Sequence, residues 1–118
     1  MKKNILKEKS FLFAIRIINL YKYLKKEHLE YVISKQILRS GTAVGALVRE
    51  AEFAESTKDF IYKFSIALKE SNESLYWLDL LAATDFLEEK MYFSLKKDCE
   101  ELLKLLVSTI KTSKQKIK

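Results

Sequence analysis

The chain has 118 residues, of which 48% are hydrophobic and 32% charged, and it contains no proline. This length suits one domain with a buried core, and a composition rich in helix formers predicts an all-α fold. The formal net charge of +6 is compatible with a polyanionic partner and equally with a lysine-rich, well-solvated surface. The single cysteine excludes an internal disulfide, and no uncharged apolar run approaches the ~18 residues of a membrane span. Because no secretory signal is evident either, we expect a soluble cytoplasmic protein.

Hydrophobic residues recur at steps of three and four positions in four segments, which is typical of amphipathic helices. Ser10 is a plausible cap for the first helix, and Ser56 with Asp59 resembles a capping box before the third. Short links between the helices favour an up-down-up-down four-helix bundle in a single domain, 1–118. The predicted helices cover about 10–26, 30–54, 57–83 and 88–113, and a basic tail follows at 114–118.

Both glycines of the chain fall in the second predicted helix, four residues apart. Gly41 and Gly45 therefore share one helical face, where Ser40 and Val44 lie beside them. Each glycine in a helix interior costs roughly 1 kcal/mol relative to alanine. We therefore assign these four residues to close helix packing or to an interface between chains.

The third and fourth predicted helices carry more apolar residues than one core-facing stripe needs. A second apolar face has to be buried elsewhere, because a monomer would otherwise expose a large patch. We therefore expect a homo-oligomer, assembled through these two helices or through the glycine stripe, with Trp77 as a further interface candidate. The extra residues are Ile61, Ile66, Leu68, Trp77, Leu80, Leu81, Leu103, Leu105 and Val107.

Positive charge gathers toward the two ends of the chain. Residues 1–30 hold eight Lys or Arg against three Glu, whereas 61–90 hold three Lys against six acids. If the second and third helices are antiparallel, Arg39 should form an ion pair with Glu73 or Glu70. The candidates for contacts with phosphate groups are Arg16, Lys22, Lys25, Lys26, Lys35, Arg39, Arg49, Lys96, Lys97, Lys104 and Lys111.

Arrangements typical of enzymes are mostly absent from the sequence. One histidine and one cysteine are too few for the usual zinc sites, and no Glu-x-x-His pair or glycine-rich phosphate loop occurs. We interpret His28 as a solvated residue of the first link and Cys99 as a small core residue. The carboxylates of the second and third helices are more typical of surface ion pairs than of acid–base chemistry. The sequence thus indicates a protein that is not an enzyme, with no cofactor and no metal.

Several motifs in a fixed order carry a family resemblance. The chain closely resembles the bacterial four-helix bundle proteins encoded in ribosomal RNA intervening sequences, from Phe11 to about Thr112. It departs from the pattern at Leu47, where relatives often have Asn, and in the first link, which lacks their proline. The motifs are QILRSGTAVGA (36–46), REA (49–51), DFI (59–61), IALKE (66–70) and YWL (76–78).

The resemblance implies a left-handed four-helix bundle that assembles as a homopentamer. In a related branch, the accessory variability determinant of diversity-generating retroelements, basic surfaces of the pentamer bind nucleic acid and a reverse transcriptase. The leading hypothesis is therefore an oligomeric bundle that binds RNA or DNA as an accessory factor of a mobile element or of an RNA-related process. The alternative is a structural or protein-interaction scaffold whose positive charge has no specific role.

Overall fold

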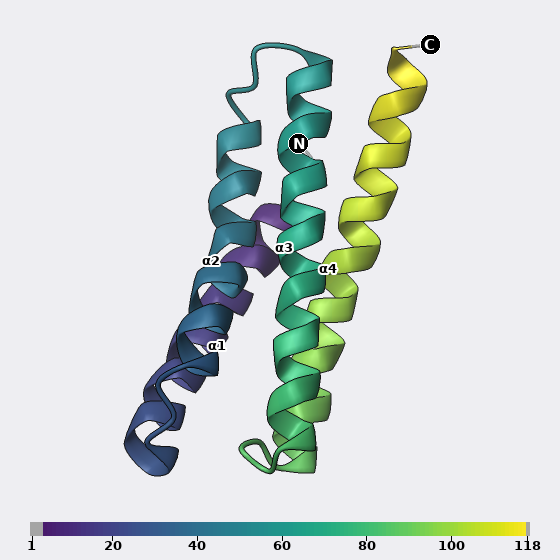
Figure 1. The fold of residues 1–118 in the computed structure, drawn as a ribbon. Helices are drawn as coiled ribbons and strands as arrows, with labels where there is room; N and C mark the ends of the chain where they lie inside the picture. The colour runs from purple at the N-terminus through teal and green to yellow at the C-terminus, as the bar shows by residue number, and fades with distance from the viewer. Residues whose placement is uncertain (1–3, 118) are drawn as a thin grey trace.

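A computed structural model describes residues 4–117, which form four α-helices and no strand. They are α1 (Ile5–His28), α2 (Ile33–Ala51), α3 (Thr57–Ala83) and α4 (Glu89–Lys116). Figure 1 shows short links joining these long helices into an elongated body, 49 × 24 × 21 Å in extent. The predicted all-α fold of four helices is confirmed.

The predicted start of the third helix is confirmed, and that of the first is wrong. Ser56 Oγ accepts a hydrogen bond from the Asp59 amide at 3.0 Å, and α3 begins at the next residue. In α1 the cap is Asn4, whose side chain accepts from the Lys7 amide at 3.0 Å, so the helix begins five residues before Ser10. Ser10 is fully buried and its hydroxyl donates to the Lys7 carbonyl.

The second and fourth helices differ from the predicted ranges at their ends. Instead of 30–54, α2 spans 33–51, because Glu30 lies before the helix and its carboxylate accepts hydrogen bonds from the first backbone amides. Partial burial raises the pKa of Glu30, but these hydrogen bonds outweigh it and lower the pKa overall. At the other end of the chain, α4 continues to Lys116, into the segment predicted to be a tail. Lys118 lies outside the described residues.

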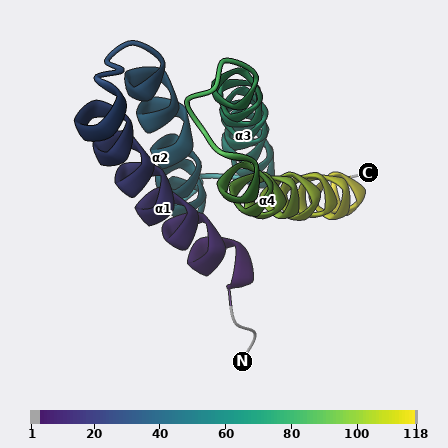
Figure 2. The ribbon, with the colours of Figure 1, turned by 90° about the horizontal axis from the view of Figure 1, so that it is seen from below.

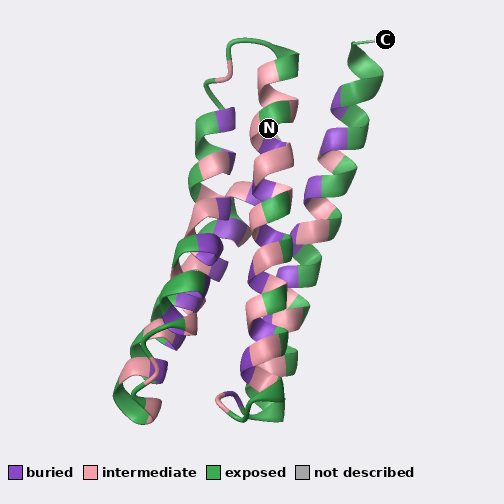
Figure 3. Ribbon diagram, in the orientation of Figure 1, coloured by how far each residue is buried: buried purple, intermediate pink, exposed green. Residues whose placement is uncertain are grey.

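The core runs along the inner faces of all four helices, as the buried residues in Figure 3 show. In Figure 2, α1 lies beside α2 and α3 beside α4, whereas the first half of α1 and the second half of α4 point apart. The fully buried side chains with the largest volumes include Phe13, Ile17, Leu24, Ile37, Leu78, Leu95, Leu102 and Leu106.

The glycine stripe packs α2 against α1 of the same chain. A Cβ added at Gly41 would lie 2.8 Å from both Cγ atoms of Ile17, and one added at Gly45 would lie 3.4 Å from the carbonyl oxygen of Ser10. On the side toward α3, the hydroxyls of Ser40 and Ser74 hydrogen-bond at 2.8 Å. Small residues thus bring α2 close to both neighbours, and a surface for a second chain has to lie elsewhere.

The exposed apolar surface is concentrated on a different helix from the one expected. On α3, Ile61, Leu68 and Trp77 are partly buried against the core of their own chain. The first helix instead presents a row of large apolar side chains to solvent. The sequence analysis placed the excess apolar residues on the third and fourth helices and missed this row on α1.

Candidate nucleic-acid interface

Two of the predicted phosphate-contacting arginines are engaged within the chain. Arg16 Nη1 donates to Asp98 Oδ2 at 2.7 Å and its Nη2 donates to Ser94 Oγ at 3.0 Å, which joins α1 to α4. Arg39 forms ion pairs with Glu70 at 3.1 Å and with Glu73, so the predicted bridge between α2 and α3 is confirmed. Phosphate binding by either arginine would have to compete with these carboxylates.

The Arg39 cluster extends to the single tryptophan. Trp77 Nε1 donates to Glu73 Oε2 at 2.9 Å. This hydrogen bond, followed by those from Arg39, outweighs partial burial and lowers the pKa of Glu73. The interactions join α2 to α3 and leave the Glu73 carboxylate ionised, which points to a structural function for Arg39 and Trp77.

Three other predicted basic residues lie over aromatic rings, at distances typical of cation–π contacts. The Lys25 ammonium is 4.8 Å from the ring centroid of Tyr21, and the Arg49 guanidinium is 5.6 Å from that of Phe11. Tyr21 lies on the same helix as Lys25, whereas the contact of Arg49 with Phe11 joins α2 to α1. On α4, Lys96 has the same relation to the ring of Tyr92, at 5.5 Å.

The outer face of α4 carries four lysines at intervals of seven residues, which we call the lysine ridge. All four are exposed, and within residues 4–117 none of them forms an ion pair. A helix rise of 1.5 Å per residue places neighbours about 10 Å apart, in a row about 30 Å long. The ridge consists of Lys90, Lys97, Lys104 and Lys111.

Two acids of the same helix form ion pairs with α1. Asp98 pairs with Arg16, and Glu101 pairs with Lys9 at 3.1 Å. The leucines and the cysteine on the opposite side of α4 are buried in the core. The ridge is therefore opposite the buried face, but exposed Phe93, Glu100 and Glu101 border it, because they are three or four residues from Lys97.

A second, smaller group of exposed lysines lies around the link between α1 and α2. Lys22 and Lys26 are on the last turns of α1, and Lys35 is on the first turn of α2. None of the three is part of an ion pair within the described chain. The eleven predicted contact residues thus do not form one surface.

Sequence reasoning missed Lys90 as a contact candidate, although the predicted helix 88–113 includes it. The seven-residue period of the lysines is visible in the sequence once all four positions are placed on one helix. Two helical turns span about seven residues, so this period marks one face of a helix.

The remaining chemical groups offer little for catalysis. Burial raises the pKa of the Cys99 thiol to about 12, and the thiol donates to the Ser71 carbonyl oxygen at 3.2 Å. His28 is not a solvated link residue as predicted; it belongs to the last turn of α1 and its ring contacts those of Tyr23 and Phe86. Over residues 4–117, no three His, Cys, Asp or Glu side chains are grouped to hold a metal ion. None of the helices there combines the length and apolar character needed to cross a membrane.

Comparison with protein families gives a match over residues 2–108 to the model of the 23S rRNA-intervening sequence protein. The chain belongs to this family. A solved structure of the S23 ribosomal protein family, a protein of unknown function from Bacteroides thetaiotaomicron, is 55% identical to this family member. The alignment covers 91% of this chain and 99% of that one, with a TM-score of 0.90. A search of curated proteins gives no match.

Proposed function

We propose that this member of the intervening-sequence family is a non-enzymatic, oligomeric helical bundle that binds RNA or DNA through its lysine ridge. The observation that carries the proposal is the row of four unpaired lysines, 90, 97, 104 and 111, on the outer face of α4. Lysine ammonium groups act as point charges toward phosphates, and contacts with phosphates carry no sequence information directly. The binding should therefore show little sequence preference.

The dimensions of the ridge suit a nucleic-acid backbone. Its length of about 30 Å is close to the ~34 Å of one helical turn of duplex DNA. As part of the same proposal, the four helices form a left-handed up-down-up-down bundle, and several copies assemble into a ring, for which five is the expected number. Several ridges in one assembly would raise the overall affinity, because binding by one ridge raises the effective concentration of the next.

The test is a titration of fluorescently labelled structured RNA and duplex DNA at several salt concentrations. We expect log K to fall linearly with log salt, with a slope of roughly −0.9 per phosphate neutralised on duplex DNA. Replacing all four ridge lysines by glutamine should reduce the steepness of this slope by about 3 to 4. The oligomeric mass of each sample is measured in the same buffers.

A matched variant replaces Lys35, Lys58, Lys114 and Lys116 by glutamine, so that its net charge equals that of the ridge variant. All four of these lysines are exposed. The proposal requires this control to retain most of the affinity and slope. Equal losses in both variants would assign binding to overall charge, and an absence of binding by the unmodified protein even at low salt would overturn the proposal.

A second candidate function is a protein-interaction scaffold, which is favoured by the exposed apolar side chains of α1. In that case the ridge would serve solubility, and its removal would change neither assembly nor the capture of a partner. The salt titration distinguishes the two, because a scaffold without a phosphate-binding function has no ridge-dependent slope.

A further inference from the structure

One helix of this chain has two apolar faces, and only one of them is covered. The inner face of α1 is buried in the core, whereas its outer face carries side chains that are 37–53% exposed. We call this outer row the α1 stripe; the Arg49 guanidinium of α2 lies over its Phe11 ring, and within residues 4–117 no contact joins α1 to α3. The α1 stripe consists of Ile5, Phe11, Leu12, Ile15 and Ile18.

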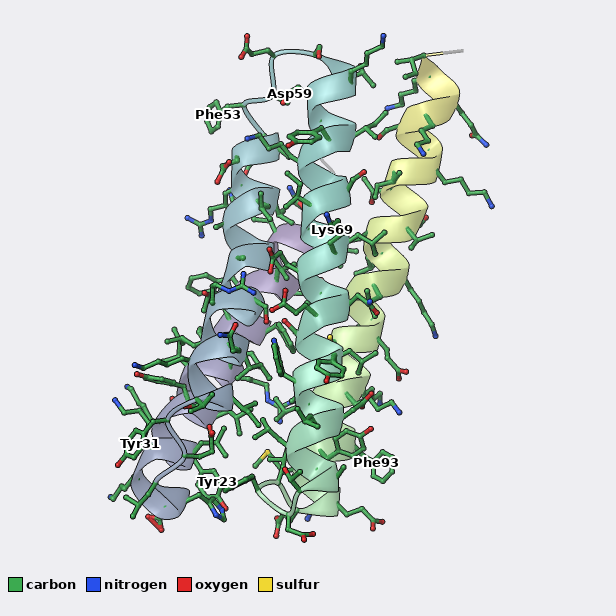
Figure 4. The ribbon with its side chains drawn as sticks, in the orientation of Figure 1. Tyr23, Tyr31, Phe53, Asp59, Lys69 and Phe93 are labelled. Carbon is green, nitrogen blue, oxygen red and sulfur yellow. The ribbon has the colours of Figure 1, made fainter. Side chains whose placement is uncertain are left out.

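A second uncovered apolar surface lies on α3. Its outer side carries Tyr62 and Tyr76, which are 60% and 56% exposed, together with the half-buried Ile66 and Leu80. Lys69, labelled in Figure 4, lies midway between the two tyrosines along the helix. We call this surface the α3 face. Since α1 packs on α2 and α4 and not on α3, the stripe and the face cannot cover each other within one chain.

We propose that the α1 stripe of one copy packs against the α3 face of a second copy, in a head-to-tail contact. This inference rests on the homo-oligomer of the proposed function and names the surfaces that build it. A symmetric contact of stripe on stripe would leave the α3 face exposed, whereas one head-to-tail contact covers both surfaces. Head-to-tail contacts form a closed ring when their rotation closes.

Charged residues at one end of the molecule indicate the direction of α1 of one copy relative to α3 of the next. The last turns of α1 carry Lys22, Lys25 and Lys26, and the turn from α3 to α4 carries four acids. Both groups lie at the same end, because the His28 ring is 5.6 Å from that of Phe86. The acids are Asp79, Asp85, Glu88 and Glu89.

In a ring whose axis is parallel to the helices, neighbouring copies keep the same height. The lysines of one α1 then meet the acids of the next copy, which favours the contact and steers its formation. An antiparallel contact would move these lysines to the opposite end from the acids. The charges therefore favour parallel packing of α1 on the neighbouring α3.

The same ends also give the register. Placing His28 level with the neighbour's turn at Asp85 and Phe86 sets Ile18 level with Tyr76 of the second copy. Tyr62 lies fourteen residues earlier on α3, about 21 Å away along the helix axis. We therefore expect residue 18 of one copy to lie near residue 76 of the next copy and far from residue 62.

Disulfide cross-linking tests this register in the absence of nucleic acid. Under mild oxidation, I18C/Y76C should form covalently linked oligomers, whereas I18C/Y62C and the unmodified protein should not. The native Cys99 is fully buried, so it does not compete. Covalent dimers from I18C alone would indicate stripe-on-stripe packing and overturn the proposal, as would equal yields from the two double variants.

A second variant tests the apolar contact without any disulfide. Ile15→Lys should weaken self-association about tenfold or more, because it places a charge in the middle of the stripe. Val107→Lys, at a position 50% exposed on α4, should leave association unchanged. Circular dichroism shows whether each variant keeps its helices; if only Ile15→Lys loses them, the cross-linking result decides.

The mass of the unmodified protein separates the possible failures. A monomer at micromolar concentration would overturn both this contact and the oligomer of the proposed function. An oligomer that fails to link through I18C/Y76C would overturn the contact alone. Nucleic-acid binding is measured in a separate titration, so its outcome does not depend on either result.

Discussion

The outer faces of α1 and α4 occupy similar positions and have opposite chemistry. Both terminal helices turn one side to the core and one to solvent, yet α1 exposes residues such as Phe11 and Ile15 where α4 exposes Lys97 and Lys104. Lysines on an outer face keep their charge in water at little cost. A row of exposed apolar residues does have a cost, unless a partner covers it. The two faces therefore point to different partners, a second chain for α1 and a polyanion for α4.

The largest expected effect is a loss of stability that differs between the two sides of α1. Ile17 is fully buried and Ile18, the next residue, is 37% exposed. Ile17→Ala should lower the free energy of unfolding by about 2–5 kcal/mol, because it removes buried methyl groups and leaves a cavity. Ile18→Ala should have less than about a quarter of that effect in a monomeric sample. Urea unfolding followed by circular dichroism measures both, and similar losses would show that the outer face is not free.

The next effect concerns the face of α2 on which α1 packs. Gly41→Ala places a Cβ 2.8 Å from Ile17, a β-branched and fully buried residue that has little freedom to move. Overpacking of about 1–3 kcal/mol outweighs the roughly 1 kcal/mol gained in helix propensity. We expect a net loss of about 1–2 kcal/mol in the free energy of unfolding.

Gly45→Ala is the matched control for that substitution. Its Cβ would meet the Ser10 carbonyl oxygen at 3.4 Å, which is close to ordinary contact. The propensity gain should then dominate, and stability should rise by up to about 1 kcal/mol. Thermal unfolding of the two variants compares them directly; the same sign for both would mean that the α1–α2 contact adjusts more easily than its geometry indicates.

The helices were predictable from sequence because their apolar residues are periodic and one of their caps is typical. Ser56 with Asp59 identifies the start of α3, and it is confirmed at the predicted residue. The start of α1 was missed because Asn4 is an equally good cap, and Ser10, a common cap residue, instead fills a buried position against α2. Amino-acid type alone does not separate a capping serine from a packing serine.

The candidate interface was less predictable than the fold, because pairing is a property of three-dimensional structure. Nothing in the sequence shows that Arg16 is held by Asp98 from a helix some eighty positions away. The Arg39 pairs were foreseen, since α2 and α3 are adjacent and the register follows from their short link. The lysines of α4 were selected for their charge and not for their spacing, so Lys90 and the seven-residue period of the ridge were missed.

A single charge reversal on the ridge sharpens the contrast between the ridge and the rest of the surface. Lys97→Glu should weaken binding of duplex DNA about fivefold or more at physiological salt, because one phosphate contact is replaced by repulsion. Lys58→Glu changes the net charge equally, at an exposed position on α3. If the ridge is the binding surface, Lys58→Glu should change affinity by less than about twofold. Fluorescence anisotropy measures both, and a larger effect from Lys58→Glu would place the binding surface away from the ridge.

The smallest effect concerns how the ends of these helices are fixed. Glu30 accepts hydrogen bonds from the amides of Ile33 and Ser34 at 2.9 and 2.7 Å, whereas Glu88 precedes α4 without a capping hydrogen bond from its side chain. Glu30→Ala should therefore cost about 1 kcal/mol or less near neutral pH, and Glu88→Ala should cost less still.

The effect of Glu30 should also depend on pH, with a definite sign. Because the folded state lowers its pKa, the ionised carboxylate contributes stability above the pKa of the unfolded chain. That contribution is lost as the pH falls through the lower pKa of the folded state. The difference in free energy of unfolding between the unmodified protein and Glu30→Ala should thus be largest near neutral pH and shrink as the pH falls through the pKa of the folded state. A difference that stays constant from pH 7 to pH 3 would mean that the Glu30 carboxylate does not hold the first turn of α2 through its charge, and that the α1–α2 link depends on packing alone.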